Sequence, residues 1–477
     1  MADNSYSKIL KSTSIVGGAK FVVLLLGLIK VKIAAVLLGP VGVGLLGIFQ
    51  SVIDFARNSA GLGVPVSGVK VLASKSGDQL ELEKSIISLR IISISSSLLA
   101  AIFIFAYGEV IITSSFDIEG SYNIKLLSIA VLFTNLTAFK LAEIQALRFL
   151  KLLATAQILG AFFSTISVVI IFYICSFDGI VYSLISTSII MYLFSLCYAR
   201  KKIKVKITFV DLISFKSHAK EMISLGMYMT FNLTLSIITL YAVRYYIASK
   251  GSLDDVGLFQ AVFTITTGYF GLLLSAMMTD FFPRISQEKT DENINLKTNE
   301  QATITILFGG PILALLTMFS PLVLSFLYSS EFLAANELLR WRLYSVLFTL
   351  VSWPVGVIAL AKGKGHYSSV NDIFSSILTL ISIYVLWERI GLLSTSIAYV
   401  VSSIFSIGII SFFAYKVSGF SYQRDYINKV IVNVAVLTAI NLIFNIELEA
   451  ILQYSLVSVL VIILLVYSYN SFRKIIK

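Results

Sequence analysis

Long apolar runs separated by short polar stretches recur along the whole chain. A helix needs about 20 apolar residues to cross the hydrocarbon of a bilayer. The pattern predicts fourteen such spans, at residues 12–38, 42–69, 85–107, 123–147, 152–175, 179–199, 219–248, 256–282, 301–327, 337–361, 369–387, 391–415, 427–446 and 450–470. The run 427–446 gives the weakest signal, because it is short and interrupted by Asn433, Asn441 and Asn445. Outer-membrane strands would alternate apolar and polar residues, and the runs do not alternate. The sequence therefore predicts an all-α integral membrane protein with about fourteen transmembrane helices.

The composition agrees with this prediction. Of the 477 residues, 57% are hydrophobic and only 13% are charged, whereas soluble domains carry about 25% charged residues. This balance leaves little room for a sizeable domain outside the membrane.

Basic residues gather in alternate connections between the spans. The densest group comprises Arg200, Lys201, Lys202, Lys204 and Lys206. The intervening connections are almost devoid of base and carry acids instead. Because an excess of Lys and Arg marks cytoplasmic loops, both termini are predicted to be cytoplasmic. The net charge of +11 then reflects topology and contact with anionic lipids, and no folded domain accompanies the basic run to support nucleic-acid binding.

An internal repeat divides the chain. The string Gly-Ile-Phe-Gln-Ser-Val at residues 47–52 resembles Gly-Leu-Phe-Gln-Ala-Val at residues 257–262, and each lies in the second span of a half. This pattern predicts two six-helix lobes related by a pseudo-twofold axis along the membrane normal. The predicted domains are an N-terminal lobe at 1–206, a C-terminal lobe at 207–416 and an additional two-helix hairpin at 417–477.

Charged residues inside the spans are the candidates for chemistry, because a charge in hydrocarbon costs at least a few kcal/mol. Residues three or four apart share a helix face, which pairs Arg57 with Asp54, Lys140 with Glu143, Arg340 with Glu337 and Arg284 with Asp280. A structural role explains such pairs as well as a functional one. Asp54 and Asp280 are also candidates for ion coupling, although their basic neighbours give a sufficient structural reason for them.

Other cations in the spans have no acid at such a spacing: Lys20, Lys30, Lys32 and Arg244. Lys32 and Arg244 lie toward outer helix ends and could reach the headgroups by snorkelling. Lys20 lies about 12 Å into its helix, which favours a water-filled or ligand-facing lumen for Lys20 and Lys30. Since base exceeds acid in the spans, such a lumen would attract phosphate or carboxylate. Arg342 adds a guanidinium, the group best suited to phosphate, near the outer end of its span.

The sequence gives little support for a metal site, a redox site or a catalytic site. Cys175 and Cys197 are interpreted as buried small hydrophobes near opposite membrane faces, and His218 and His366 fall in short polar loops without a ligand cluster. The chain has no G-x-S-x-G motif and no P-loop. We therefore expect no resident cofactor and no enzymatic activity.

Three segments near the N-terminus carry a family resemblance: TSIVGG at 13–18, IKVKIAAVLLGPVGVGLLGIFQ at 29–50 and AGLGVPVSGVK at 60–70. They resemble the N-terminal region of bacterial O-antigen translocases, the polysaccharide-transport members of the multidrug/oligosaccharidyl-lipid/polysaccharide exporter superfamily. The resemblance implies a flippase that moves undecaprenyl-diphosphate-linked oligosaccharide to the outer leaflet of the bacterial inner membrane. It also implies alternating access around a cationic cavity and coupling to an H⁺ or Na⁺ gradient. Fourteen spans are similar to the lipid II flippase branch, in which two extra helices form a groove for the polyprenyl tail.

The sequence hypothesis is thus a flippase whose substrate diphosphate is held by Lys20, Lys30, Arg57, Arg244 and Arg342. Its expected partners are the lipid-linked oligosaccharide and membrane lipids, with a polysaccharide polymerase and a chain-length regulator as further candidates. Two alternatives stay open. One is a small-molecule or drug antiporter of the same superfamily, and the other is a membrane polysaccharide polymerase or ligase.

Overall fold

The computed structural model describes residues 2–75, 77–116, 123–203, 212–446 and 449–476. These residues form helices and no strand, which confirms the predicted all-α class. The α-helices are α1 (Ala2–Gly61), α2 (Val64–Ser74), α3 (Gln79–Phe116), α4 (Leu127–Ala146), α5 (Leu150–Cys175), α6 (Gly179–Lys202), α7 (Leu212–Lys250), α8 (Leu253–Phe263), α9 (Phe270–Ser286), α10 (Asp291–Met318), α11 (Ser320–Leu327), α12 (Asn336–Ala361), α13 (His366–Ile390), α14 (Leu393–Ser418), α15 (Arg424–Asn445) and α16 (Ala450–Ile476). A π-helical turn, η3 (Thr264–Tyr269), joins α8 to α9, and short 3₁₀ turns, η1 (Ile124–Leu126), η2 (Ser176–Asp178) and η4 (Ser330–Ala335), precede α4, α6 and α12.

By length and apolar composition, eleven helices of the described chain could cross a membrane, or twelve if a bent pair in α7 counts as one span. Two of these segments, Gly17–Gly61 and Leu150–Lys202, have 45 and 53 residues, roughly twice the length that one crossing needs. The first contains a break at Gly39, and the second contains η2 between α5 and α6. Dividing both at these breaks gives a number of spans compatible with the predicted fourteen.

The break in α1 has a local cause. Gly39 has φ 61° and ψ −166°, a combination that residues with a Cβ rarely adopt. Pro40 follows it and has no N–H to donate to the preceding turn. The pair thus ends the first span and begins the second, at the place where the sequence predicts a turn between residues 38 and 42.

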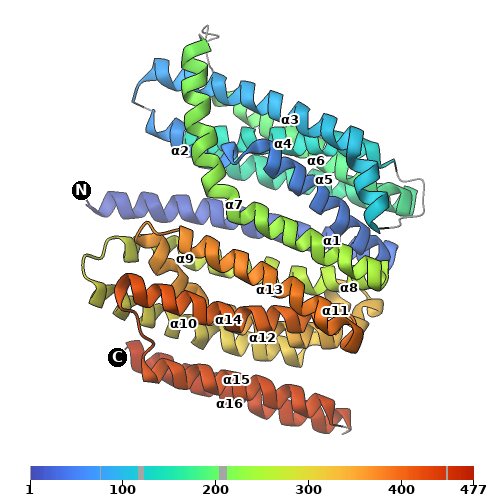
Figure 1. Cartoon of the computed structure of the whole chain (residues 1–477), viewed down its shortest axis with the longest axis vertical. Helices are drawn as coiled ribbons and strands as arrows, with labels where there is room; N and C mark the ends of the chain where they lie inside the picture. Colours follow the sequence, from blue (N-terminus) through green and yellow to red (C-terminus); the bar gives the residue numbers. More distant parts are fainter. Residues whose placement is uncertain (1, 76, 117–122, 204–211, 447–448, 477) are drawn as a thin grey trace. The chain divides into compact units, whose positions relative to one another are not determined.

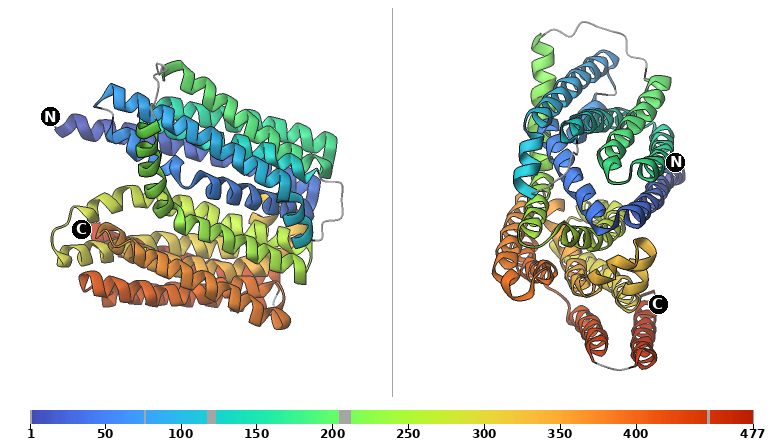
Figure 2. Two further views of the ribbon diagram at one scale, coloured as in Figure 1. Left: turned by 45° about the horizontal axis from the view of Figure 1, so that its top comes forward. Right: turned by 90° about the vertical axis from the view of Figure 1, so that its right-hand side faces the viewer.

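The chain folds into two compact units, Met1–Gly257 and Leu258–Lys477. Within each unit the long helices lie side by side (Figures 1 and 2). In the first unit, α5 packs on α6 and α1, α4 packs on α6 and α3, and α7 packs on α1, α2 and α3. In the second, α12 packs on α14 and α10, and α15 and α16 pack on α10. Packing therefore places α7 with the first unit, whereas the boundary at 206/207 follows the repeat and stays a prediction.

The asparagines that weaken the hydropathy of α15 make contacts between helices. Asn441 Nδ2 donates to the Tyr344 hydroxyl at 3.1 Å, and Arg340 Nη2 donates to Asn445 Oδ1 at 3.5 Å. Asn433 lies directly against Gly310 of α10, where an added Cβ would be 1.7 Å from its Oδ1. Polar side chains and close glycine contacts hold helices together where water is absent. Low hydropathy at 427–446 therefore reflects interhelical packing.

Helix α7 bends by 53° between the segments Ser214–Met227 and Thr230–Lys250. Next to the bend, Gly226 lies against the turn that separates α1 from α2. A Cβ on Gly226 would be 2.4 Å from the carbonyl oxygen of Leu62, and Gly63 has φ +68°. Ser67 Oγ also donates to the carbonyl of Met222 at 2.6 Å. The bent segment is therefore fixed to the α1–α2 turn by backbone-to-backbone contact.

Candidate functional site

A cavity of about 640 Å³ lies inside the first unit, and we call it the chamber. Its lining comes from α1, α2, α4, α5 and α6: Gln50, Ile53, Arg57, Pro65, Val66, Val69, Thr134, Thr137, Ala138, Leu141, Ala142, Gln145, Gln157, Leu184, Thr187, Ser188 and Met191. The α4 residues recur every three or four positions, so they occupy one face of that helix. The same spacing holds on α1 and α6. One face of each of these helices therefore builds the chamber wall.

Most polar groups of the chamber are neutral. Three glutamines, Gln50, Gln145 and Gln157, supply amides that can both donate and accept hydrogen bonds. Thr134 and Thr187 add hydroxyls, while Thr137 Oγ1 donates to the carbonyl of Phe133 in its own helix at 2.7 Å. The remaining lining is mostly aliphatic. Such a wall suits a ligand with many hydroxyl or amide groups.

Arg57 is the one cation among the described residues that line the chamber. Its Nη2 lies 3.4 Å from Asp54 Oδ1, and the two side chains are 33% and 30% exposed. Gln50 Nε2 donates to the other Asp54 oxygen at 3.2 Å. This confirms the pair predicted from the sequence. A guanidinium carries five donors, so one ion pair leaves Arg57 able to bind an anionic group of a ligand.

The polar side chains that line the chamber lie at two levels, measured along the helices from their ends near the α1 break, η1 and η2. Arg57, Gln145 and Gln157 each lie about five helical turns from Pro40, Leu127 and Cys175, which are the ends of their helices near the α1 break, η1 and η2. Since α5 runs opposite to α4, these three residues share one level. Gln50, Thr134 and Thr187 lie only about two to three turns from the corresponding ends. The chamber therefore has one level with a cation and a second level with neutral groups only.

The other predicted cations of the first unit do not line the chamber. Lys20 is exposed on α1, and no hydrogen bond or ion pair joins it to another described residue. Lys30 is half-buried and donates from Nζ to Ser164 Oγ of α5 at 2.7 Å. Arg244 is buried in α7 and donates from Nη1 to Ser51 Oγ of α1. Lys30 and Arg244 thus bind hydroxyls on neighbouring helices.

Arg342 lies in the second unit, on α12. Its side chain is buried, with 4% exposed, and its guanidinium carbon is 3.2 Å from the Tyr399 ring centroid and 5.9 Å from that of Phe263. Cation–π contact of this kind partly replaces hydration. Its Nη1 has no hydrogen-bond partner among the described residues. Arg342 is therefore a buried cation held by aromatic rings.

The two acids named for ion coupling differ in their surroundings. Asp54 is held beside the chamber by Gln50 and Arg57. Asp280 on α9 is 81% exposed, and its nearest cation, Arg284, is 3.9 Å away. Of the two acids, Asp54 is the one held next to a cavity.

An ion cluster centred on the buried carboxylate of Glu143 joins α4 to α3. Glu143 is 1% exposed and binds Lys140 Nζ at 2.7 Å, which confirms that predicted pair. The guanidinium of Arg90 on α3 binds the same carboxylate. Arg90 was missed in the sequence, because its acid lies on another helix and residue spacing detects partners only within one helix.

Two smaller interpretations are wrong. Cys175 and Cys197 are exposed rather than buried. His218 lies on α7 rather than in a loop, where it is buried and has Nε2 at 3.2 Å from Glu81. Among the described residues, no group of three His, Cys, Asp or Glu side chains could hold a metal ion.

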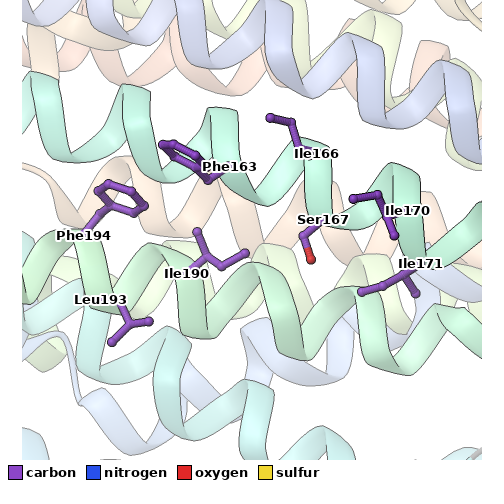
Figure 3. Close-up of a pocket in the computed structure, with 8 residues that line it drawn as sticks. All are labelled: Phe163, Ile166, Ser167, Ile170, Ile171, Ile190, Leu193 and Phe194. Carbon is purple, nitrogen blue, oxygen red and sulfur yellow. The ribbon is translucent and has the colours of Figure 1, made fainter.

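A second cavity, of about 400 Å³, lies between α5 and α6. Figure 3 shows Phe163 and Phe194 at one end of it and Ile170 and Ile171 at the other. The two phenylalanine rings stack with centroids 5.3 Å apart. Ser167 is its one polar lining residue among those the structure describes. This groove suits hydrocarbon and offers little to a phosphate or a sugar, so the chamber is the candidate site.

A family model described as polysaccharide biosynthesis protein matches residues 9–289, more than half of the 477 residues. The chain belongs to this family. The matched region includes the complete chamber. No protein of curated function matches the chain in sequence.

Solved structures confirm the fold of this polysaccharide biosynthesis family member. Lipid II flippase MurJ in an inward closed conformation matches with a TM-score of 0.72 and 19% identity, over 97% of this chain and 99% of that one. An inward-facing multidrug resistance MATE transporter of the MOP superfamily matches with a TM-score of 0.70 and 15% identity, over 84% and 96%. A MOP superfamily transporter from Pyrococcus furiosus, described as having a binding pocket of reverse polarity, matches at 0.61 and 17%, over 86% and 94%. All three are transport proteins by name rather than enzymes, in agreement with the expectation from the sequence.

Proposed function

We propose that the protein moves a saccharide linked to a polyprenyl diphosphate, such as an undecaprenyl-diphosphate-linked O-antigen repeat unit, from the cytoplasmic to the outer leaflet of a bacterial inner membrane. The observation that carries the proposal is the chamber of the first unit, a cavity whose wall combines neutral polar and aliphatic side chains with Arg57 at one level. Membership of a polysaccharide biosynthesis family and the fold of a lipid II flippase support it.

Sugar and phosphate need different surroundings, and the chamber offers both. Hydroxyl and acetamido groups of a saccharide exchange hydrogen bonds with amides such as Gln145 and Gln157. A phosphate forms its strongest contacts with a guanidinium, which can grip two oxygens at once. Arg57 lies at the level of both glutamines, so a phosphate next to the first sugar would meet all three side chains.

The remaining predicted ligands would act at other stages of transport. Lys30 and Arg244 each donate to a serine hydroxyl, a partner that a phosphate could replace with a stronger ionic contact. Lys20 is exposed on α1, and Arg342 retains a donor without a partner among the described residues. In this proposal Lys20, Lys30, Arg57, Arg244 and Arg342 bind the diphosphate, while the polyprenyl tail stays in the lipid.

Ion coupling would involve Asp54. Arg57 Nη2 lies 3.4 Å from Asp54 Oδ1 and Gln50 Nε2 donates to the other oxygen, so Asp54 is held next to the groups that would meet the phosphate. Exchange of H⁺ or Na⁺ for the substrate in an alternating-access cycle would couple outward transfer to an inward ion gradient, with Asp280 as the second candidate.

The experiment is a vesicle assay of leaflet transfer. Purified protein is reconstituted with a fluorescent polyprenyl diphosphate disaccharide, and a membrane-impermeant enzyme reports the probe that reaches the outer leaflet. Arg57→Gln removes the charge and should lower the transfer rate by about tenfold or more, since charge-assisted contacts are worth roughly twice a neutral hydrogen bond. Arg57→Lys should retain part of the rate. Equal rates for the wild type and protein-free vesicles would contradict the proposal.

A drug antiporter is the second candidate, because Asp54 places a carboxylate beside the chamber and the fold also matches that of a MATE transporter. It would take up a lipophilic cation in exchange for H⁺ or Na⁺. Transport of a cationic dye by the same vesicles, abolished by Asp54→Asn and unaffected by Arg57→Gln, would favour this reading over the flippase.

A further inference from the structure

The distribution of charge in the chamber limits the kind of saccharide that it can hold. Apart from Arg57, every described lining residue is neutral. Arg57 in turn is paired with Asp54 at 3.4 Å. The wall beyond this pair consists mainly of amides, hydroxyls and aliphatic side chains. The lining therefore has one place for an anionic group, and this place lies at one level only.

We infer that the chamber selects lipid-linked saccharides whose sugars are uncharged, with neutral hexoses and N-acetylhexosamines accepted and uronic or other acidic sugars rejected. The inference rests on the proposed function, since it concerns the sugar of the same substrate. The cationic lumen predicted from the sequence would have favoured acidic sugars, so the two readings make opposite predictions.

The cost of burying a charge decides this selectivity. If Arg57 binds the phosphate, a carboxylate on a following sugar would lie at the level of Gln50, Thr134 and Thr187, which supply no cation. Burying a charge without a partner costs far more than burying a hydroxyl that finds a hydrogen bond. Asp54 would add like-charge repulsion, because Gln50 holds its carboxylate on the same side of α1.

The neutral groups are also adapted to sugars. Gln145 and Gln157 come from different helices, α4 and α5, and reach the same level as Arg57. An amide can accept from a hydroxyl and donate to an acetamido oxygen without a change in its protonation state. A sugar therefore needs no charge to bind these amides. Apolar side chains such as Val69 and Leu141 can cover the apolar face of a sugar ring.

Two probes test the inference. Both are fluorescent polyprenyl diphosphate disaccharides, one of N-acetylglucosamine and galactose and one with glucuronic acid in place of galactose. In reconstituted vesicles, the neutral probe should be transferred at least about tenfold faster than the acidic probe, given the cost of an unpaired buried carboxylate. Binding of both probes to the purified protein by calorimetry should show the same order.

Variants that gain transfer of the acidic probe test whether the missing cation in the chamber causes the selectivity. Thr187→Lys and, separately, Thr134→Lys add a cation at the level where the carboxylate of the second sugar would lie, and should raise binding and transfer of the acidic probe relative to the neutral one. Thr187→Met, which adds a side chain of similar length to lysine without its charge, should weaken binding of the neutral probe and give the acidic probe no advantage. Using two lysine variants guards against one of them failing to fold.

The outcomes separate the inference from the proposed function. Transfer of both probes at equal rates by the wild type overturns the neutral-sugar inference and leaves the flippase intact. Transfer of neither probe overturns the flippase, and the binding data then decide the inference. Stronger binding of the acidic probe by the wild type would overturn the inference and restore the cationic-lumen reading.

Discussion

Single charged residues in the membrane depend on the partners they find. Lys30 illustrates this, because its ammonium lies within hydrogen-bond distance of Ser164 on a neighbouring helix. The hydrogen bond to Ser164 satisfies one N–H donor of the ammonium. Because a hydroxyl is neutral, this bond does not balance the positive charge of Lys30. Lys20 has no hydrogen-bond or ion-pair partner among the described residues. Both lysines are therefore suited to an anion that arrives with the substrate.

If these lysines bind phosphate, Lys20→Ala and Lys30→Ala should each lower transfer of the diphosphate probe while protein levels in the membrane stay unchanged. Ser164→Ala is the matched control for Lys30, since it removes the internal hydrogen bond and keeps the charge. It should lower transfer less than Lys30→Ala does. Full activity of the Lys20→Ala, Lys30→Ala double variant in the vesicle assay would exclude both residues from the diphosphate site.

At the scale of elements, packing between helices depends on a few polar and glycine contacts. The buried carboxylate of Glu143 ties α4 to α3 through Arg90 while also holding Lys140 of its own helix. Glu143 is not among the α4 residues that line the chamber. The ion cluster thus orients the chamber-facing side of α4 without lining the chamber.

Glu143→Gln leaves Arg90 and Lys140 without their acid, and breaking a buried pair in this way costs about 3 kcal/mol or more. We expect a lower unfolding temperature in detergent, measured by thermal denaturation with a tryptophan or thiol probe. The triple change Glu143→Leu, Arg90→Leu, Lys140→Leu removes all three charges and should recover much of the lost stability. A triple variant less stable than Glu143→Gln would show that the cluster itself stabilises α3 against α4.

Backbone contact at Gly226 leads to a second prediction at this scale. Gly226→Ala would place its Cβ 2.4 Å from the carbonyl oxygen of Leu62, and neither backbone can yield easily. The expected loss is about 1–3 kcal/mol, as for other overpacked sites, with impaired transfer because α7 is displaced from the α1–α2 turn. Gly27→Ala is the control, since nothing lies within 4 Å of its added Cβ. Equal unfolding temperatures for the two variants would argue against the close contact.

The whole molecule carries a predicted orientation, with both termini in the cytoplasm. Cys175 ends α5 and Cys197 lies near the basic end of α6, and both thiols are exposed. In intact cells whose outer membrane has been opened, a membrane-impermeant maleimide should label the Cys197→Ser variant, through Cys175. The Cys175→Ser variant should be labelled only after the inner membrane is permeabilised. The reverse pattern would invert the topology.

The sequence alone determined the class of the protein and most of its helices. Exposing backbone or polar side-chain groups to hydrocarbon costs free energy, so each membrane span must be an apolar helix. This constraint acts on each segment independently of the others. Hence the spans, the turn at Gly39–Pro40 and the pairs of Arg57 with Asp54 and Lys140 with Glu143 could be predicted from local spacing. The family resemblance was likewise carried by contiguous residues and was confirmed by the family match at residues 9–289.

The tertiary structure decided which polar side chains meet. Gln50, Thr134, Gln145, Gln157 and Thr187 come from four helices, and their convergence depends on the rotation of each helix against its neighbours, which hydropathy does not encode. The recurrence of lining residues at helical spacing on α1, α4 and α6 was the only signal in the sequence. Arg90 was missed for the same reason. Charge counted along the chain indicated a cationic lumen. Among the described lining residues, packing instead places one arginine, which is paired with Asp54, in the chamber. Lys30 and Arg244 bind serine hydroxyls on adjacent helices.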